Sequence, residues 1–90
     1  MITRVGKIAR LPLAVRTELN ERLQNGESHR NLVAWLNGLP PVQETMAREF
    51  GGRPISAPNM TAWKQGGYME WEMRRKIFEQ TRILTREYHG

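Results

Sequence analysis

Apolar residues recur at every third or fourth position along most of the chain, and glycine or proline interrupts the pattern repeatedly. This spacing places apolar side chains along one face of an α-helix, and no segment shows the two-residue alternation of a β-strand. The clearest rows are Leu11, Val15, Leu19 and Leu23, then Leu32, Trp35, Leu36 and Leu39, then Val42, Met46 and Phe50. The sequence therefore predicts an all-α fold, in which about four short helices form a compact domain and a longer helix follows at the C-terminal end.

Turn and capping residues set the expected helix boundaries. Asn25-Gly26 and Gly66-Gly67 are typical helix stops, Ser28 is a preferred N-cap, and Pro40-Pro41 predicts a stiff corner. The expected helices cover about residues 12–25, a segment that Ser28 caps, about 42–50, about 57–65, and Tyr68 to about Tyr88. The expected core contains Leu19, Leu23, Leu32, Trp35, Leu36, Phe50, Met60 and Trp63. We expect Trp35 to anchor this core rather than to stack on a base, so that Trp35→Ala costs about 3 to 5 kcal/mol.

The stretch from Met46 to Gly67 has the features of two helices joined by a turn. Gly51-Gly52 ends the first helix, because glycine adopts the left-handed conformation without a Cβ clash. Ser56 is suited to cap the second helix, and Ile55 and Met60 occupy the two positions of a hydrophobic staple. This arrangement is typical of a helix-turn-helix. The chain then divides into a basic N-terminal arm (1–10), a helix-turn-helix domain (11–67) and a C-terminal helix (68–90).

The 57–65 helix is the candidate recognition helix. Its outer face carries short, uncharged side chains, which can approach a base edge closely and offer hydrogen-bond donors and acceptors. The alternative is a solvated surface helix with no partner. The residues expected to contact DNA are Ala57, Asn59, Thr61 and Gln65 near base edges, the N-cap Ser56 beside them, Arg53 and Lys64 at phosphates, and Arg4, Lys7 and Arg10 in the arm. We expect the arm to be mobile in the free protein, and the spacing of its charges suits contact with a phosphate backbone or a minor groove of DNA. The alternative is a frayed, solvated terminus that binds nothing.

Composition narrows the possible partners and sites. The 90 residues make one small domain, whose net charge of +5 and pI near 10.5 favour a polyanionic partner. There is no cysteine, and His29 and His89 lack ligand spacing, so we expect no metal and no cofactor. No apolar run approaches the roughly 20 residues that cross a bilayer, and a secretory signal is absent. We therefore expect a cytoplasmic protein that does not enter a membrane.

The last helix carries more apolar residues than a small core requires. Met73, Ile77, Leu84 and Tyr88 form an imperfect row, and mixed charges surround it. We therefore expect a homo-oligomer that forms through this helix and falls to monomer when residues 72–90 are removed. Gln80 occupies a position that would be apolar in a regular coiled coil, so the sequence only weakly supports a coiled coil in this helix.

The N-terminal third resembles a family of small phage and prophage helix-turn-helix proteins of the Mu-like type. In that family, an Ala-Trp-Leu-Asn stretch is followed almost at once by the Ile-Ser that opens the recognition helix, whereas here Gly38 to Pro54 intervenes. The matching residues are Ile8, Leu11-Pro12, Val15-Arg16, Glu18-Leu19-Asn20, Arg22-Leu23, Gly26, Ala34-Trp35-Leu36-Asn37 and Ile55-Ser56. The family is similar in outline to small terminase subunits and phage regulators, so the resemblance implies DNA binding. Because of the insertion, two helices are candidates to brace the recognition helix, and we expect the 42–50 helix to do so.

These observations together predict a protein that binds double-stranded DNA, as a transcription regulator or a DNA-packaging recognition protein. An enzyme is not expected, because no catalytic groups converge and Glu70 and Glu72 fall on different sides of a helix. No small-molecule substrate is expected either. The main alternative is a protein-protein interaction module that uses Trp63, Tyr68 and Trp71 as exposed aromatics together with the C-terminal helix. Salt dependence separates the two, because phosphate contacts weaken steeply as ionic strength rises.

Overall fold

The computed structural model describes the backbone of residues 6–89 and the side chains of residues 6–84. Within this part of the chain every regular element is helical, which confirms the predicted all-α fold. Four short helices precede one long helix, as expected. The elements are a 3-10 turn η1 (Ile8–Arg10), α1 (Leu13–Gln24), α2 (His29–Asn37), α3 (Pro40–Glu49), α4 (Ala57–Gln65) and α5 (Gly67–His89).

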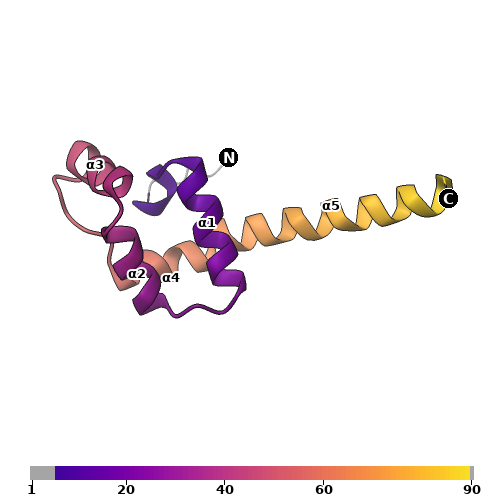
Figure 1. Cartoon of the computed structure of the whole chain (residues 1–90), viewed down its shortest axis with the longest axis horizontal. Helices are drawn as coiled ribbons and strands as arrows, with labels where there is room; N and C mark the ends of the chain where they lie inside the picture. The colour runs from indigo at the N-terminus through magenta and orange to yellow at the C-terminus, as the bar shows by residue number, and fades with distance from the viewer. Residues whose placement is uncertain (1–5, 90) are drawn as a thin grey trace.

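The first four helices gather into a globular head, and α5 runs away from it as a single long rod (Figure 1). The molecule is accordingly elongated, with extents of 53 × 30 × 21 Å. Helix α4 follows α3 through a loop and leads almost directly into α5. The head therefore presents α4 at the point where the rod begins.

The core of the head draws on every element from η1 to the first turn of α5. Six residues expected in the core are buried: Leu19, Leu23, Leu32, Leu36, Met60 and Trp63. Trp35 and Phe50 are only partly buried, so their assignment to the core interior is wrong. The buried residues absent from the expected set are Ile8, Leu11, Val42, Met46, Ile55 and Tyr68, with Asn20 and Thr45 as buried polar residues.

Trp35 packs at the edge of the core and is covered by a charged side chain. The guanidinium of Arg22 lies 4.3 Å from the centre of the Trp35 ring. Ion pairs hold that guanidinium in place, at 2.9 Å to Glu18 and 3.3 Å to Glu27. Trp35 thus supplies a face for cation–π stacking instead of filling the interior.

The expectation of an N-terminal arm over residues 1–10 is wrong from Lys7 onward. Ile8 is 2 % exposed and forms part of the core, because η1 turns it inward. Lys7 Nζ donates a hydrogen bond of 3.0 Å to the carbonyl of Pro54, and Arg10 lies 3.9 Å from the carboxylate of Glu49. Arg4 lies outside the described residues.

Helix α3 begins earlier than expected. Pro40 and Pro41 occupy its first turn, where a missing N–H breaks no helical hydrogen bond and the fixed φ of proline suits the helix. They therefore start α3 rather than forming a separate corner before it. By contrast, the predicted limits of α4 are confirmed at Ala57–Gln65, since local capping residues define both of its ends.

Candidate nucleic-acid interface

The start of α4 is fixed by a capping box. Ser56 Oγ accepts a hydrogen bond of 3.4 Å from the backbone N–H of Asn59, and Asn59 Oδ1 accepts one of 2.8 Å from the backbone N–H of Ser56. The Ser56 hydroxyl also donates to Asn59 Oδ1 at 2.8 Å. This reciprocal pairing satisfies two free N–H groups at the helix N-terminus. Both side chains thus cap the N-terminus of α4, and the side-chain oxygen Oδ1 of Asn59 is engaged there and is not a free acceptor on the outer face.

The inner side of α4 is anchored by Met60 and Trp63. Met60 is fully buried, and Ile55, its expected staple partner, is buried in the same core. The indole Nε1 of Trp63 donates a buried hydrogen bond of 2.8 Å to Asn20 Oδ1 on α1. Because an unpaired buried amide is costly, this bond fixes how α4 lies across α1.

Helix α2, and not α3, braces α4. The main neighbours of α4 are α5, α2 and η1. The expectation that the helix next in sequence would take this role is therefore wrong. The reason is a pair of hydrogen bonds that joins the end of α2 directly to the residue before the α4 cap.

Asn37 makes both of those bonds with one side chain. Its Nδ2 donates to the carbonyl of Ile55 at 2.9 Å, and its Oδ1 accepts from the N–H of Ile55 at 2.8 Å. An amide side chain carries both a donor and an acceptor, so it pairs with a backbone peptide as a neighbouring strand would. We call this arrangement the Asn37 clamp. It brings residues 37 and 55 together and leaves Gly38–Pro54 as an excursion from the α2–α4 pair.

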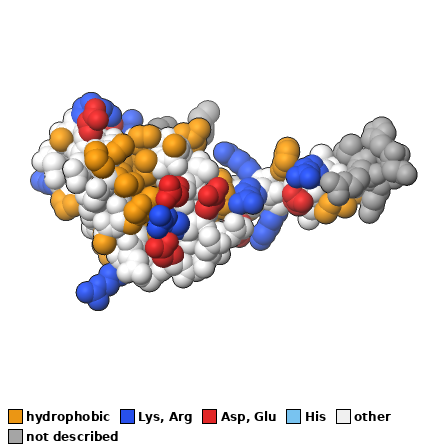
Figure 2. Space-filling model, viewed as in Figure 1, with side chains coloured by type: hydrophobic (Ala, Val, Ile, Leu, Met, Phe, Trp, Pro, Cys, Tyr) orange, Lys and Arg blue, Asp and Glu red, His pale blue; other side chains and the backbone are white. Residues whose placement is uncertain are grey.

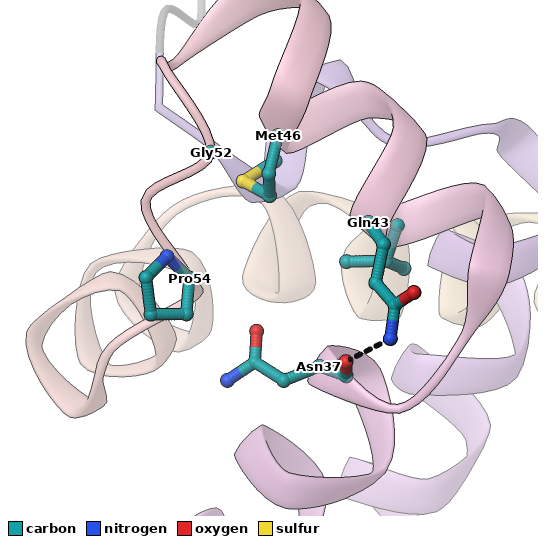
Figure 3. Close-up of a pocket in the computed structure, with 6 residues that line it drawn as sticks. Asn37, Gln43, Met46, Gly52 and Pro54 are labelled. Carbon is teal, nitrogen blue, oxygen red and sulfur yellow. Dashed lines mark hydrogen bonds between the residues drawn. The ribbon is translucent and has the colours of Figure 1, made fainter.

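The excursion is itself well packed. Val42 and Met46 of α3 are buried, and Gly51 and Gly52 adopt positive φ values of 63° and 81°. The N–H of Gly52 bonds to the carbonyl of Met46 at 2.8 Å, which closes the end of α3. Figure 3 shows the Asn37 side chain directed toward Pro54 and the hydrogen bond of 3.0 Å from Gln43 Nε2 to the Asn37 carbonyl. A cavity of about 110 Å³ is lined by Asn37, Val42, Gln43, Met46, Gly52 and Pro54.

Substitution of Asn37 tests the clamp. We expect Asn37→Ala to lower the free energy of unfolding by about 1 to 3 kcal/mol, because it leaves the part-buried N–H and carbonyl of Ile55 without partners. Gln43→Ala is the matched control, since it removes one exposed hydrogen bond to the same segment and should change stability by less than about 0.5 kcal/mol. Urea unfolding followed by circular dichroism measures both. Equal effects of the two variants would show that the clamp does not hold α4.

The outer side of α4 is open to solvent. Ala57, Thr61, Lys64 and Gln65 are all exposed, and Asn59 is half-buried. The Thr61 hydroxyl donates to the carbonyl of Ala57 at 3.2 Å, so this hydroxyl is satisfied within the helix. A shallow concavity lies beside this face, lined by His29, Thr61, Lys64, Gln65, Tyr68 and Met69. His29 and Met69 were not among the predicted contacts, and only the pairing of α2 with α4 brings His29 there.

Of the basic residues predicted to contact DNA, some are exposed and others have partners within the chain. Arg53 is exposed in the loop before α4, and Lys64 is exposed on α4 itself. Lys7 is engaged with the Pro54 carbonyl and lies 5.9 Å from the centre of the Phe50 ring. Arg10 faces Glu49. Arg53 and Lys64 are therefore the two predicted cations best placed to reach phosphates beside α4.

The aromatic residues proposed for an alternative protein contact are mostly interior. Trp63 is 9 % exposed and Tyr68 is 8 % exposed, so neither is a surface anchor. Trp71 is partly buried, and the Arg75 guanidinium lies 4.8 Å from the centre of its ring. An interaction module built on these three side chains as exposed aromatics is not supported by their burial.

Tyr68 and Glu72 form a polar contact at the base of α5. The Tyr68 hydroxyl donates to Glu72 Oε2 at 2.7 Å, and this bond, together with Lys76, lowers the pKa of the Glu72 carboxyl. Burial, followed by the bond to Glu72, raises the pKa of Tyr68. The stabilisation from Glu72 is present above its unfolded pKa and is lost as the pH falls through its lowered folded pKa. Both residues belong to α5, so this contact stabilises the first turns of that helix at neutral pH.

Comparison with known proteins gives no match to a protein-family model, a curated protein or a solved structure. Across the described part of the chain, no cluster of three or more histidine, aspartate or glutamate side chains is arranged to hold a metal ion. None of the described helices combines the length and apolar character that a membrane crossing demands.

Proposed function

We propose that this protein binds double-stranded DNA through α4, with α2 as its bracing helix, and acts in transcription regulation or in DNA recognition for packaging. The observation that carries the proposal is the Asn37 clamp, which joins the end of α2 to the start of α4 although α3 lies between them in sequence. A helix-turn-helix requires such a direct pairing of two helices. The clamp links Asn37 to Ile55, and in the family that this chain resembles the corresponding Ala-Trp-Leu-Asn and Ile-Ser segments are nearly adjacent.

The chemistry of the exposed α4 face supports a base-reading role. Gln65 can bond adenine through two atoms, and the Thr61 methyl can contact a thymine methyl, so the preferred site is expected to contain A·T pairs. Ala57 allows close approach near the helix N-terminus. Ser56 and Asn59 contribute by holding that N-terminus, since their side chains are engaged with each other.

Phosphate contacts are assigned to cations around this face. Arg53 and Lys64 are exposed on either end of the α4 region and lack a carboxylate partner among the ion pairs of the described residues. Lys7 and Arg10 lie on the η1 side of α4, and Arg4 precedes them in sequence. A net charge of +5 supports such a role through long-range attraction.

Affinity measurements on two classes of variant, with one control variant, test the proposal. Gln65→Ala and Thr61→Ala are expected to cost about 1 to 3 kcal/mol on the preferred site and little on random DNA. Lys64→Ala and Arg53→Ala should weaken binding to both DNAs alike and reduce the salt slope by about one. Selection from a random DNA pool supplies the preferred site, and fluorescence anisotropy at fixed salt gives the affinities.

Arg48→Ala is the matched control for charge. Arg48 is an exposed cation on α3, at 3.7 Å from Glu44, and α3 is not one of the main neighbours of α4. The Arg48→Ala variant should bind DNA with an affinity within about twofold of the unmodified protein, because only the long-range electrostatic attraction to DNA changes. If Arg48→Ala weakens binding as much as Lys64→Ala, while Gln65→Ala has no effect, α4 is not the recognition helix. Salt-independent binding to a protein partner would favour the interaction module instead.

A further inference from the structure

Helix α5 carries most of the exposed apolar surface of the described chain. Seven large hydrophobic side chains are prominently exposed, and Leu13 is the one that lies outside α5. The six on α5 are Met69, Met73, Ile77, Phe78, Ile83 and Leu84. Figure 2 shows hydrophobic and basic side chains close together along the rod where it leaves the head. Apolar surface of this extent on one element marks an interaction site.

Four of these residues lie on one side of the helix, along with one polar residue. At about 100° per residue, Met69, Met73, Ile77 and Leu84 fall within roughly 80° of one another. They are 53 %, 59 %, 60 % and 56 % exposed. Gln80 lies between Ile77 and Leu84 in the same sector, and it is also exposed. We call these five residues the α5 row.

The α5 row points away from the head. The side of α5 that packs on the head is marked by buried Tyr68 and by Arg75, whose Nη1 donates to Gln24 Oε1 of α1 at 3.1 Å. By helical geometry this side lies roughly 140 to 160° from the centre of the row. From Met73 onward the row therefore packs against no other element in the described part of the chain. At its near end, Met69 shares the concavity with Thr61 and Gln65, so the row continues the exposed face of α4.

We propose that the α5 row pairs with the same row of a second copy of this chain, in parallel. Gln80 argues for a self-contact, because in a parallel two-fold pair its amide meets an identical amide that can both donate and accept. The charges beside the row permit this arrangement: Lys76 comes opposite Thr81 of the second copy, and Arg74 comes opposite Met69, which lies at the edge of the row. Neither Lys76 nor Arg74 is brought face to face with a like charge in this register, and Glu70 is the charged residue that lies nearest to its own copy.

The size of the row fits a weak dimer that DNA strengthens. Its apolar patch is on the order of a few hundred Å² per chain, below the roughly 800 Å² per partner of a standard interface. A parallel pair keeps both heads, and with them both α4 helices, at one end of the assembly. This parallel sense rests on the proposed DNA-binding function, whereas self-association does not and can be measured without DNA.

The absence of cysteine from the chain allows a direct test. In a parallel pair, Gln80→Cys places two sulfurs close enough for a disulfide, and mild oxidation should give a covalent dimer of twice the 10.5 kDa mass. Phe78→Cys is the matched control, since residue 78 lies on a different side of the helix. We expect the Gln80→Cys variant to oxidise at least about tenfold faster at equal concentration, and we expect adding Ile77→Glu to abolish this advantage.

Light scattering of the unmodified full-length protein, without DNA, completes the test. A concentration-dependent rise toward twice the monomer mass, lost in the Ile77→Glu variant, supports the pairing. A monomer at high concentration, with equal oxidation rates at positions 78 and 80, overturns it. An Ile77→Glu variant that remains monomeric but still binds DNA through Gln65 would separate the two proposals. Fast cross-linking of Ile77→Cys with Gln80→Cys chains, but not of Gln80→Cys alone, would overturn the parallel sense by showing an antiparallel pair.

Discussion

Replacing Trp63 with alanine is expected to lower the free energy of unfolding by about 3 to 5 kcal/mol, the cost typical of a large buried side chain. The indole is 9 % exposed and lies where α4, α1 and the start of α5 meet. Its removal also leaves Asn20, which is 4 % exposed, without the donor that now lies 2.8 Å from its Oδ1. For a small domain, a loss of this size is a large share of the total stability.

The control for this prediction is Trp35→Ala. Trp35 is only partly buried and is covered by Arg22. When the ring is removed, the Arg22 side chain can move into the vacated space or turn to solvent. Its loss should therefore cost clearly less than the loss of Trp63. This reverses the expectation from the sequence, which gave the large value to Trp35. Urea unfolding of both variants decides between the two expectations. Equal losses of unfolding free energy would contradict the deeper burial of Trp63.

Gly67→Ala is expected to destabilise the fold by about 1 to 3 kcal/mol or more, as overpacking does. A Cβ at this position would overlap the six-membered ring of Trp63, so α5 would have to tilt away from α4. The effect opposes helix propensity, by which alanine is better than glycine by about 1 kcal/mol. Glycine is thus required here because the backbone of α5 approaches the indole directly.

Gly38→Ala is the matched control, because a Cβ there would meet its nearest atom at 3.5 Å, which is ordinary contact. Thermal unfolding should show a lower midpoint for Gly67→Ala than for Gly38→Ala. If both variants melt together, α5 does not cross Trp63 in the way the structure describes. Because the substitution tilts α5, it should also slow the cross-linking of Gln80→Cys chains.

Local residues were enough to predict the all-α class and the ends of α4. The N-cap Ser56, the buried pair Ile55 and Met60, and Gly66 after Gln65 act within a few positions of the backbone they fix, so their effect can be predicted from sequence. The same holds for Ser28, whose Oγ accepts from the N–H of Asn31 at 3.2 Å as the N-cap of α2.

Only the tertiary structure decided which helix supports α4 and which side chains form the interior. Helices α2 and α3 both carry an apolar row, and nothing local shows that Asn37 bonds to Ile55 across 18 positions. Likewise, a helical wheel places Trp35 and Trp63 toward a core, but it does not show that Arg22 covers Trp35 or that Asn20 accepts a buried hydrogen bond from Trp63. These choices depend on contacts between residues far apart in sequence, and periodicity along a single helix carries no information about its partner.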